Sequence, residues 1–271
     1  MKTARRHWWG DYRTTEYVSI DPEATIAVLP VAAIEQHGPH LPVSTDTTIM
    51  QGMLETVFPR IPDDLDVRFL PVQAVGKSNE HVHAPGTLSL SPLAAIQGWA
   101  ELGASVGRAG VRKLVIVNSH GGNEEIMGIV ARELRVAFGM LAVKSSWMRF
   151  GVPDGLFGPE EMRYGIHGGD VETSLMLHFR PDLVDMAKAE YFVSNVTKAE
   201  ESFDLLRQTG THAFAWIASD LNPNGVVGDA AAATAEKGRL TAEHQADGFV
   251  RLLGDVRKAR LVDWLPHGAA S

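Results

Sequence analysis

An alternation of buried-strand patterns, polar loops and helical patterns is the feature that most limits how this chain can fold. The clearest unit runs from the strand LVIVN at 114–118, through SHGGN, into a helical pattern at 124–138. The apolar run TIAVL at 25–29 is followed by a similar loop and helix. Strands that alternate with helices favour right-handed crossovers, and unbroken apolar strands are typical of a sheet covered on both faces. We therefore predict a layered α/β/α domain with a mostly parallel sheet.

The remaining predicted elements complete a single domain that covers residues 1–271, with its core at about 20–260. Residues 148–166 are rich in Gly and Pro and are expected to form a long mobile or lid-like loop. Ligands of such sheets bind at the carboxyl ends of the strands, so the loops that follow the strands are expected to carry the site. The other expected elements are strands at 67–75 and 141–147, helices at 46–58, 91–109 and 171–179, and an alanine-rich helix at 230–260 that breaks near Gly238.

Composition limits the partners and cofactors. The formal net charge is −8, so the chain lacks the overall positive field that binds nucleic acid, and we expect no nucleic-acid partner. No uninterrupted apolar run reaches about 18 residues, so no membrane span is expected, and the lack of an export signal favours the cytoplasm. The chain has no cysteine, so a bound metal would have to be held by His, Asp and Glu.

The first polar cluster, EQHGPH, lies shortly after the strand at 25–29. Glu35 and His37 are two residues apart, so an extended segment would point both side chains to the same side. Asp46, at the start of the next helix, can turn back toward them. Carboxylate and imidazole groups suit zinc, manganese or iron, so the cluster predicts a metal site, with a solvated polar loop as the alternative.

The second cluster, SHGGN, also follows a strand directly. We predict that His120 is a metal ligand and that Asn123 caps the following helix. Gly121 and Gly122 would let a metal or substrate approach the backbone closely. The alternative is a phosphate cradle at the helix start. The spacing does not match the common phosphate-binding motifs, however, and two glutamates stand where a phosphate would bind.

The third cluster is HGGDVETS at 167–174. Glu172 would enter the site from the first turn of a helix and is predicted to be a metal ligand. His167 is predicted to carry a proton, because the pKa of an imidazole lies near neutrality. The alternative is a helix-capping motif with an incidental histidine.

Other residues are candidates for contact with the substrate. The H-x-H pair could bind a metal, but five ligands are already proposed, so substrate contact or support of the ligands is preferred. Trp147 could form an aromatic wall for a planar substrate, with core packing as an equal alternative. The candidates are His81, His83, Gly121, Gly122 and Trp147.

Taken together, these clusters resemble the motifs of the creatininase family. LPVAAIEQHGPHLPVSTD is similar to the first signature of the family, and NEHVHAPGTLSL, VIVNSHGGN and HGGDVETS are similar to later ones in the same order. GVVGDAAAATAEKG resembles a C-terminal signature. The resemblance extends from about Leu29 to Gly238 and is closest to the HGGN branch of the family.

The resemblance implies a Rossmann-like domain with two divalent metal ions per subunit, Zn, Mn or Fe, in a homo-oligomer for which a hexamer is favoured. In this reading Glu35, Asp46 and His120 hold one metal, and His37 and the bridging Asp46 hold the second. Creatininase proper has a carboxylate where this chain has Gly122. We therefore expect Glu172 to replace that ligand.

The expected function is metal-dependent hydrolysis of a C–N bond in a small amide, a lactam or a formamide by a metal-activated water. One alternative keeps the binuclear site and makes the substrate a sugar-derived lactone or keto-sugar. An alternative of another class is a non-catalytic, flavodoxin-like module that binds a phosphate or nucleotide.

Overall fold

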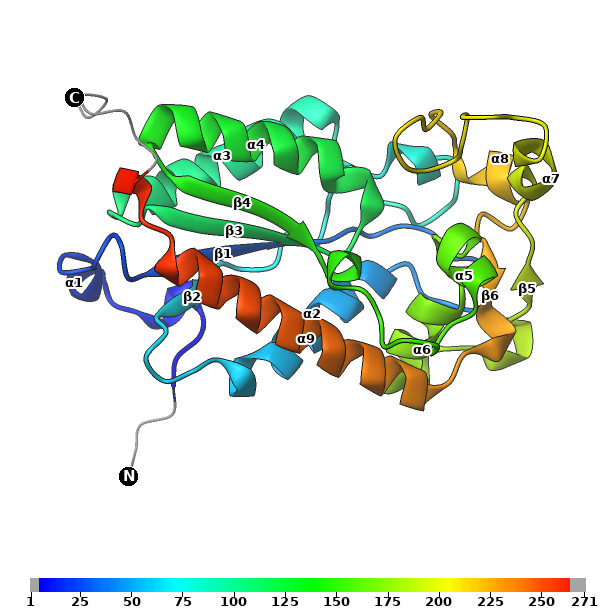
Figure 1. The fold of residues 1–271 in the computed structure, drawn as a ribbon, viewed down its shortest axis with the longest axis horizontal. Coiled ribbons are helices and arrows are strands. Elements are labelled where there is room, and N and C mark those ends of the chain that lie inside the picture. The colour runs from blue at the N-terminus through cyan, green and yellow to red at the C-terminus, as the bar shows by residue number, and fades with distance from the viewer. Residues whose placement is uncertain (1–4, 264–271) are drawn as a thin grey trace.

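Four parallel strands form the central sheet, which Figure 1 shows running through the middle of the fold. The structure, a computed structural model, describes residues 5–263. The strands are β1 (Ile26–Val31), β2 (Val67–Phe69), β3 (Lys113–Asn118) and β4 (Leu141–Ser146), in the spatial order β2-β1-β3-β4. The chain moves outward from β1 to β2 and then returns to β3 on the other side. The carboxyl ends of β1 and β3 therefore flank a topological switch point, where sheets of this kind bind ligands.

Helices cover both faces of the sheet, as Figure 1 shows with α3 and α4 on one side and α2 and α9 on the other. Trp99 and Leu134 pack on the face with α3 and α4, and Met53 and Phe249 pack on the opposite face. The predicted layered α/β fold is confirmed. The helices are α1 (Thr14–Tyr17), α2 (Thr45–Val57), α3 (Pro92–Arg108), α4 (Glu124–Phe138), α5 (Pro159–Tyr164), α6 (Asp170–Phe179), α7 (Val196–Glu200), α8 (Ala218–Leu221) and α9 (Ala235–Lys258), and a small sheet pairs β5 (Tyr191–Phe192) with β6 (Gly228–Asp229).

The predicted strand at 67–75 is too long, because β2 ends at Phe69. Pro71 has no N–H to donate to a neighbouring strand, so it interrupts the ladder. Leu70 still donates its backbone N–H to the carbonyl of Val28, and beyond Pro71 the chain pairs with β1 again at Gln73, through an isolated bridge with Val31. The segment 148–166 is not a loop throughout, because it contains α5 and part of a 3-10 helix at Trp147–Phe150.

The predicted break near Gly238 is wrong, because α9 runs continuously from Ala235 to Lys258. The helix begins later than predicted, after Thr234, whose side chain accepts a hydrogen bond from the backbone N–H of Lys237. Gly238 is buried against α6, and a Cβ at this position would overlap the carbonyl oxygen of Ser174. Glycine here allows two helices to pack closely and does not end one.

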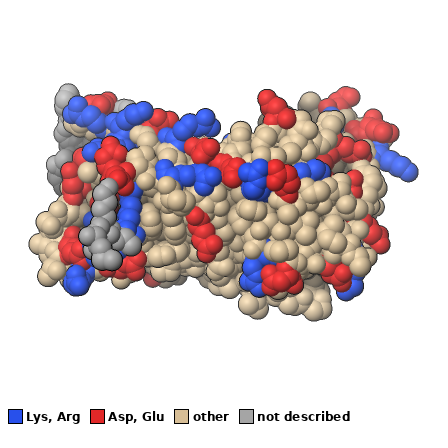
Figure 2. Space-filling view, turned by 90° about the horizontal axis from the view of Figure 1, so that it is seen from below, with Lys and Arg blue, Asp and Glu red and all other residues tan. Residues whose placement is uncertain are grey.

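Charged side chains on the face seen from below lie in small groups of mixed sign, separated by wide uncharged areas (Figure 2). Two such groups of mixed sign among the described residues are formed by Arg239 with Glu236 and Glu243, all on α9, and by Arg60 with Asp247. Among the residues that the structure describes, no helix combines the length and apolar character needed to cross a membrane.

Candidate metal centre

The chain folds so that six predicted site residues meet at the switch point between β1 and β3. Glu35 and His37 lie in the loop after β1, and Asp46 lies in the first turn of α2. His120 is the second residue after β3. His167 lies in the loop before α6, and Glu172 lies in the first turn of α6. All six are buried except Glu172, which is partly exposed. The six are Glu35, His37, Asp46, His120, His167 and Glu172.

Asp46 lies between two histidines and faces each of them with a different oxygen. Its Oδ1 is 3.5 Å from His37 Nε2, and its Oδ2 is 3.4 Å from His120 Nδ1. Glu172 Oε2 lies 3.6 Å from the same nitrogen of His37, and Glu35 Oε1 lies 3.2 Å from the same nitrogen of His120. The side chains thus form two adjacent donor sets that share one carboxylate.

The far nitrogen of each histidine is anchored to a backbone carbonyl. His37 Nδ1 lies 3.1 Å from the carbonyl oxygen of Glu35, and His120 Nε2 lies 3.0 Å from that of Lys77. A carbonyl can only accept, so these nitrogens carry the hydrogen. The other nitrogen of each ring then faces the carboxylates, which is how a histidine is oriented to bind a metal.

Three buried atoms at the centre of the cluster find no hydrogen-bond partner within residues 5–263: Glu35 Oε1, His37 Nε2 and Asp46 Oδ2. Buried polar atoms are rarely left unpaired, because each unpaired atom costs free energy. Imidazole nitrogen and carboxylate oxygen are ligands that zinc, manganese and iron accept. The donor set therefore fits divalent metal ions.

The cluster also attracts positive charge. Burial by itself would lower the pKa of His37, but the carboxylates of Asp46, Glu172 and Glu35 outweigh burial and raise it to about 10. The pKa of His120 is raised in the same way, against burial, chiefly by Glu35 and Asp46. Three carboxylates gathered in a buried space thus favour a cation beside them.

His167 differs from the other two histidines, because burial and then the neighbouring His37 and His81 lower its pKa well below the usual value. Its ring packs against those of His37 and His81, with centroids 4.1 and 4.3 Å away. Nε2 donates to the carbonyl oxygen of Gln36 at 2.9 Å, so Nδ1 bears the lone pair, 3.6 Å from Glu35 Oε1. A neutral imidazole in this orientation can accept a proton at Nδ1.

Two cavities open beside the cluster. The smaller, of about 270 Å³, is lined by Glu172, Gly121, the predicted Trp147 and several apolar side chains. Trp147 is buried and packs edge-on against Phe249, so it belongs to the core and also borders the cavity. The larger, a groove of about 1050 Å³, is lined by both predicted glycines and by His81, as well as by residues of the segment 208–220.

The structure separates the two histidines of the H-x-H pair and gives Asn123 a different role from the one predicted. His83 is exposed, and the structure does not bring it to the cluster, whereas His81 is buried with Nε2 3.5 Å from Glu35 Oε1. Asn123 precedes α4, but its side chain does not cap the helix. Instead its side-chain oxygen accepts the backbone N–H of Lys77, and its amide group donates to the carbonyl of Ala32.

Glu80 is a residue of the site that the sequence analysis missed. With Glu35 and His120 it forms a group of carboxylate and imidazole atoms that lie within 4.8 Å of one another. Although burial opposes ionisation, hydrogen bonds to His120 and Lys77 lower the pKa of Glu80 to about 2. Glu80 lies inside the NEHVHAPGTLSL motif, but the motif alone does not reveal its role, because its contact with His120 depends on how the loop after β2 folds.

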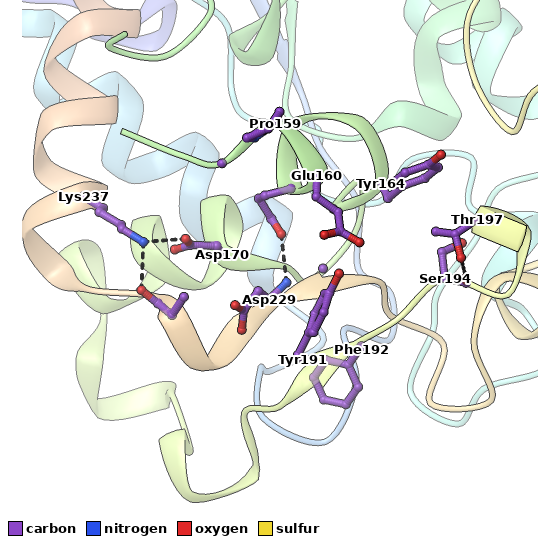
Figure 3. Close-up of a pocket in the computed structure, with 15 residues that line it drawn as sticks. Pro159, Glu160, Tyr164, Asp170, Tyr191, Phe192, Ser194, Thr197, Asp229 and Lys237 are labelled. Atoms are coloured by element: carbon purple, nitrogen blue, oxygen red, sulfur yellow. Dashed lines mark hydrogen bonds and ion pairs between the residues drawn. The ribbon is translucent and has the colours of Figure 1, made fainter. Parts of the chain in front are cut away.

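A third cavity, of about 420 Å³, lies next to α5 and the small sheet (Figure 3). Figure 3 shows Lys237 reaching to Asp170, to which its Nζ donates at 2.5 Å. Glu161 lines both this cavity and the smaller one beside the cluster. Its carboxylate accepts the backbone N–H groups of Asp229 and Val171, at 2.8 and 3.4 Å, and so ties α5 to the segment that carries His167 and Glu172.

Replacing Glu161 with alanine is expected to lower the free energy of unfolding by about 2 kcal/mol, because two backbone N–H groups would lose their acceptor. Denaturation with urea measures the change. Glu160→Ala is the matched control, since Glu160 is the exposed neighbour in the same helix and should change stability by less than about 0.5 kcal/mol. Equal stability of the two variants would show that the Glu161 contacts do not hold this segment.

The chain matches known proteins over most of its length. A family model described as creatininase, creatinine amidohydrolase, matches residues 10–253. The chain is 34% identical over 221 residues to the mycofactocin precursor peptide peptidase of Mycolicibacterium smegmatis, and the match covers 80% of each chain.

Solved structures agree with the sequence match. The manganese form of creatininase is 25% identical, with a TM-score of 0.72, and the match covers 93% of this chain and 98% of that one. A creatininase mutant of zinc–zinc type, with the same coverage, is 26% identical and has a TM-score of 0.68. Sequence, fold and the order of the motifs lead to one conclusion: the chain belongs to the creatininase family of amidohydrolases.

Proposed function

We propose that the chain is a binuclear metal-dependent amidohydrolase that cleaves a C–N bond of a small amide, a lactam or a formamide with a metal-activated water. The observation that carries this proposal is the convergence of imidazole nitrogens and unpaired carboxylate oxygens in one buried space. Residues of the two donor sets would hold two divalent ions, Zn, Mn or Fe. The proposed ligands are Glu35, His37, Asp46, His120 and Glu172.

The bound ions would supply the Lewis acidity that activates water and polarises the carbonyl group of the substrate. The protein's own contribution to proton transfer is His167, whose Nδ1 accepts the proton that the attacking water releases. The same nitrogen then delivers this proton to the departing nitrogen of the broken C–N bond. The hydrogen bond from Nε2 to Gln36 keeps the ring in the tautomer that this transfer requires.

The cavities support two kinds of substrate. A cavity of about 270 Å³ suits a small amide or lactam. The groove of about 1050 Å³ favours a second candidate, an extended peptide-like amide, and the mycobacterial relative is named for a peptide substrate. A sugar-derived lactone or keto-sugar is an alternative substrate for the same centre. Membership of a hydrolase family favours each of these activities over the alternative of a nucleotide-binding module. Assembly as a homo-oligomer and a cytoplasmic location stay predictions.

Elemental analysis combined with a hydrolysis screen tests the proposal. The purified protein should contain divalent metal, lose hydrolysis on chelation and regain it when Zn²⁺ or Mn²⁺ is added back. Suitable substrates are creatinine, formamides, hydantoins, oxindole-type lactams, sugar lactones and short peptides. Hydrolysis that survives complete metal removal, or nucleotide binding by a metal-free protein, would contradict the proposal.

A further inference from the structure

We propose that Glu80 is a positioning residue that orients His120 toward the metal centre, and that position 122 must be glycine because a side chain there would displace the Glu80 carboxylate and crowd His120 itself. The inference rests on the proposed function, since it assigns a role at the same centre. It concerns two residues whose roles depend on each other although 42 positions separate them in the sequence.

The contacts of His120 divide between its two ring nitrogens. Nδ1 faces Glu35 and Asp46, the two carboxylates of one donor set. Nε2 faces away from them, toward the carbonyl oxygen of Lys77 at 3.0 Å and Glu80 Oε1 at 3.5 Å. Both groups on the Nε2 side are acceptors, so they hold the hydrogen on this nitrogen and leave Nδ1 as the nitrogen that can bind a metal.

Glu80 is better placed to orient the histidine than to bind a metal. Its Oε1 lies beside the nitrogen of His120 that points away from the donor set, and its Oε2 accepts a hydrogen bond from Lys77 Nζ at 2.9 Å. A carboxylate that contacts the far nitrogen of a metal-binding histidine fixes its tautomer and orientation and makes it a stronger ligand. The backbone of Lys77 is itself held by Asn123, so the acceptors on this side are fixed in place.

Gly122 provides the space that this arrangement needs. A Cβ at Gly122 would overlap Glu80 Oε1, and it would lie 2.5 Å from His120 Nε2 and 2.8 Å from the carbonyl oxygen of Lys77, so it would crowd the imidazole ring and both of its acceptors. The adjacent Gly121 differs, because a Cβ there would meet nothing within 4 Å. Of the two neighbouring glycines, only Gly122 is required by the packing around His120.

Zn²⁺ affinity of the metal-free protein, measured by competition with a chelator, tests the inference without reference to activity. Glu80→Ala and Gly122→Ala should each weaken binding of at least one Zn²⁺ by about 10- to 100-fold, because His120 loses its orientation. Gly121→Ala controls for the added methyl group, and Glu125→Gln, at an exposed glutamate of the same groove, controls for lost charge. Both controls should stay within about 2-fold of wild type.

The double variant Glu80→Ala/Gly122→Ala separates orientation from other effects. Because both changes disturb the surroundings of the same nitrogen, His120 Nε2, the loss of binding free energy in the double variant should be smaller than the sum of the two single losses. The d–d spectrum of the Co²⁺-loaded Glu80→Ala protein should keep the wild-type intensity, since the number of ligands is unchanged. Thermal unfolding of each variant confirms that it is folded.

The possible outcomes are distinct. Three results would overturn the inference and leave the proposed function intact. They are wild-type Zn²⁺ affinity in Glu80→Ala, fully additive losses in the double variant, and a changed coordination number in the Co²⁺ spectrum. A wild-type protein that binds neither Zn²⁺ nor Co²⁺ would overturn both.

Discussion

Asp46→Ala is expected to abolish binding of both proposed metal ions. The two oxygens of Asp46 face different histidines, so its carboxylate is the one group common to both donor sets. Removal would leave two cations close together without the negative charge between them, and their repulsion in a buried space is strong. Elemental analysis of the purified variant should show metal near background, and hydrolysis should fall with it.

Asp170→Ala is a matched control for this experiment. Asp170 is also a buried aspartate in the first turn of a helix, but it pairs with Lys237 and Ser174. Its removal should lower stability, because it leaves Lys237 without its carboxylate partner, and should spare the metal content. Two ions per chain in Asp46→Ala would eliminate the bridging role.

The sequence predicts most of the sheet because the strands carry apolar runs that are visible without knowledge of the rest of the fold. The unbroken apolar runs of β1 and β3 require cover on both faces, and the structure provides it. The error at β2 has a local cause, because the residues after Phe69 remain apolar although Pro71 interrupts the ladder. The predicted helix break at Gly238 is wrong for a non-local reason. This glycine is needed where α9 packs against Ser174 of α6, and that contact is not visible in the sequence around Gly238.

The site residues differ in the same way, because some are placed by the order of the strands and others only by how a loop packs. Glu35, His37 and His120 follow the ends of β1 and β3, so the parallel topology by itself brings them together. Glu80 lies in the long segment between β2 and α3, where hydrophobic periodicity does not fix the path of the chain. Gly121 and Gly122 are alike in the sequence, and only the packing of that segment distinguishes them.

His167→Ala is expected to lower the turnover number by about 10²-fold or more, with the metal content unchanged. In this structure Nδ1 of His167 bears a lone pair next to the donor set, while Nε2 donates to the carbonyl of Gln36. Loss of the ring removes the group that transfers a proton to the departing nitrogen. The proposed ligands keep their own backbone anchors, so the ions should stay bound.

Steady-state kinetics together with elemental analysis distinguishes this role from a structural one. His167→Ala should reduce kcat much more than it changes KM, and added imidazole should restore part of the rate, since deletion of the side chain leaves room for a ring. His212→Ala, at an exposed histidine, should keep the wild-type rate. Proton transfer and metal binding are assigned to different side chains, so the two measurements distinguish them. Full turnover in His167→Ala would show that another group transfers the proton. Loss of metal from His167→Ala would show that His167 is a metal ligand.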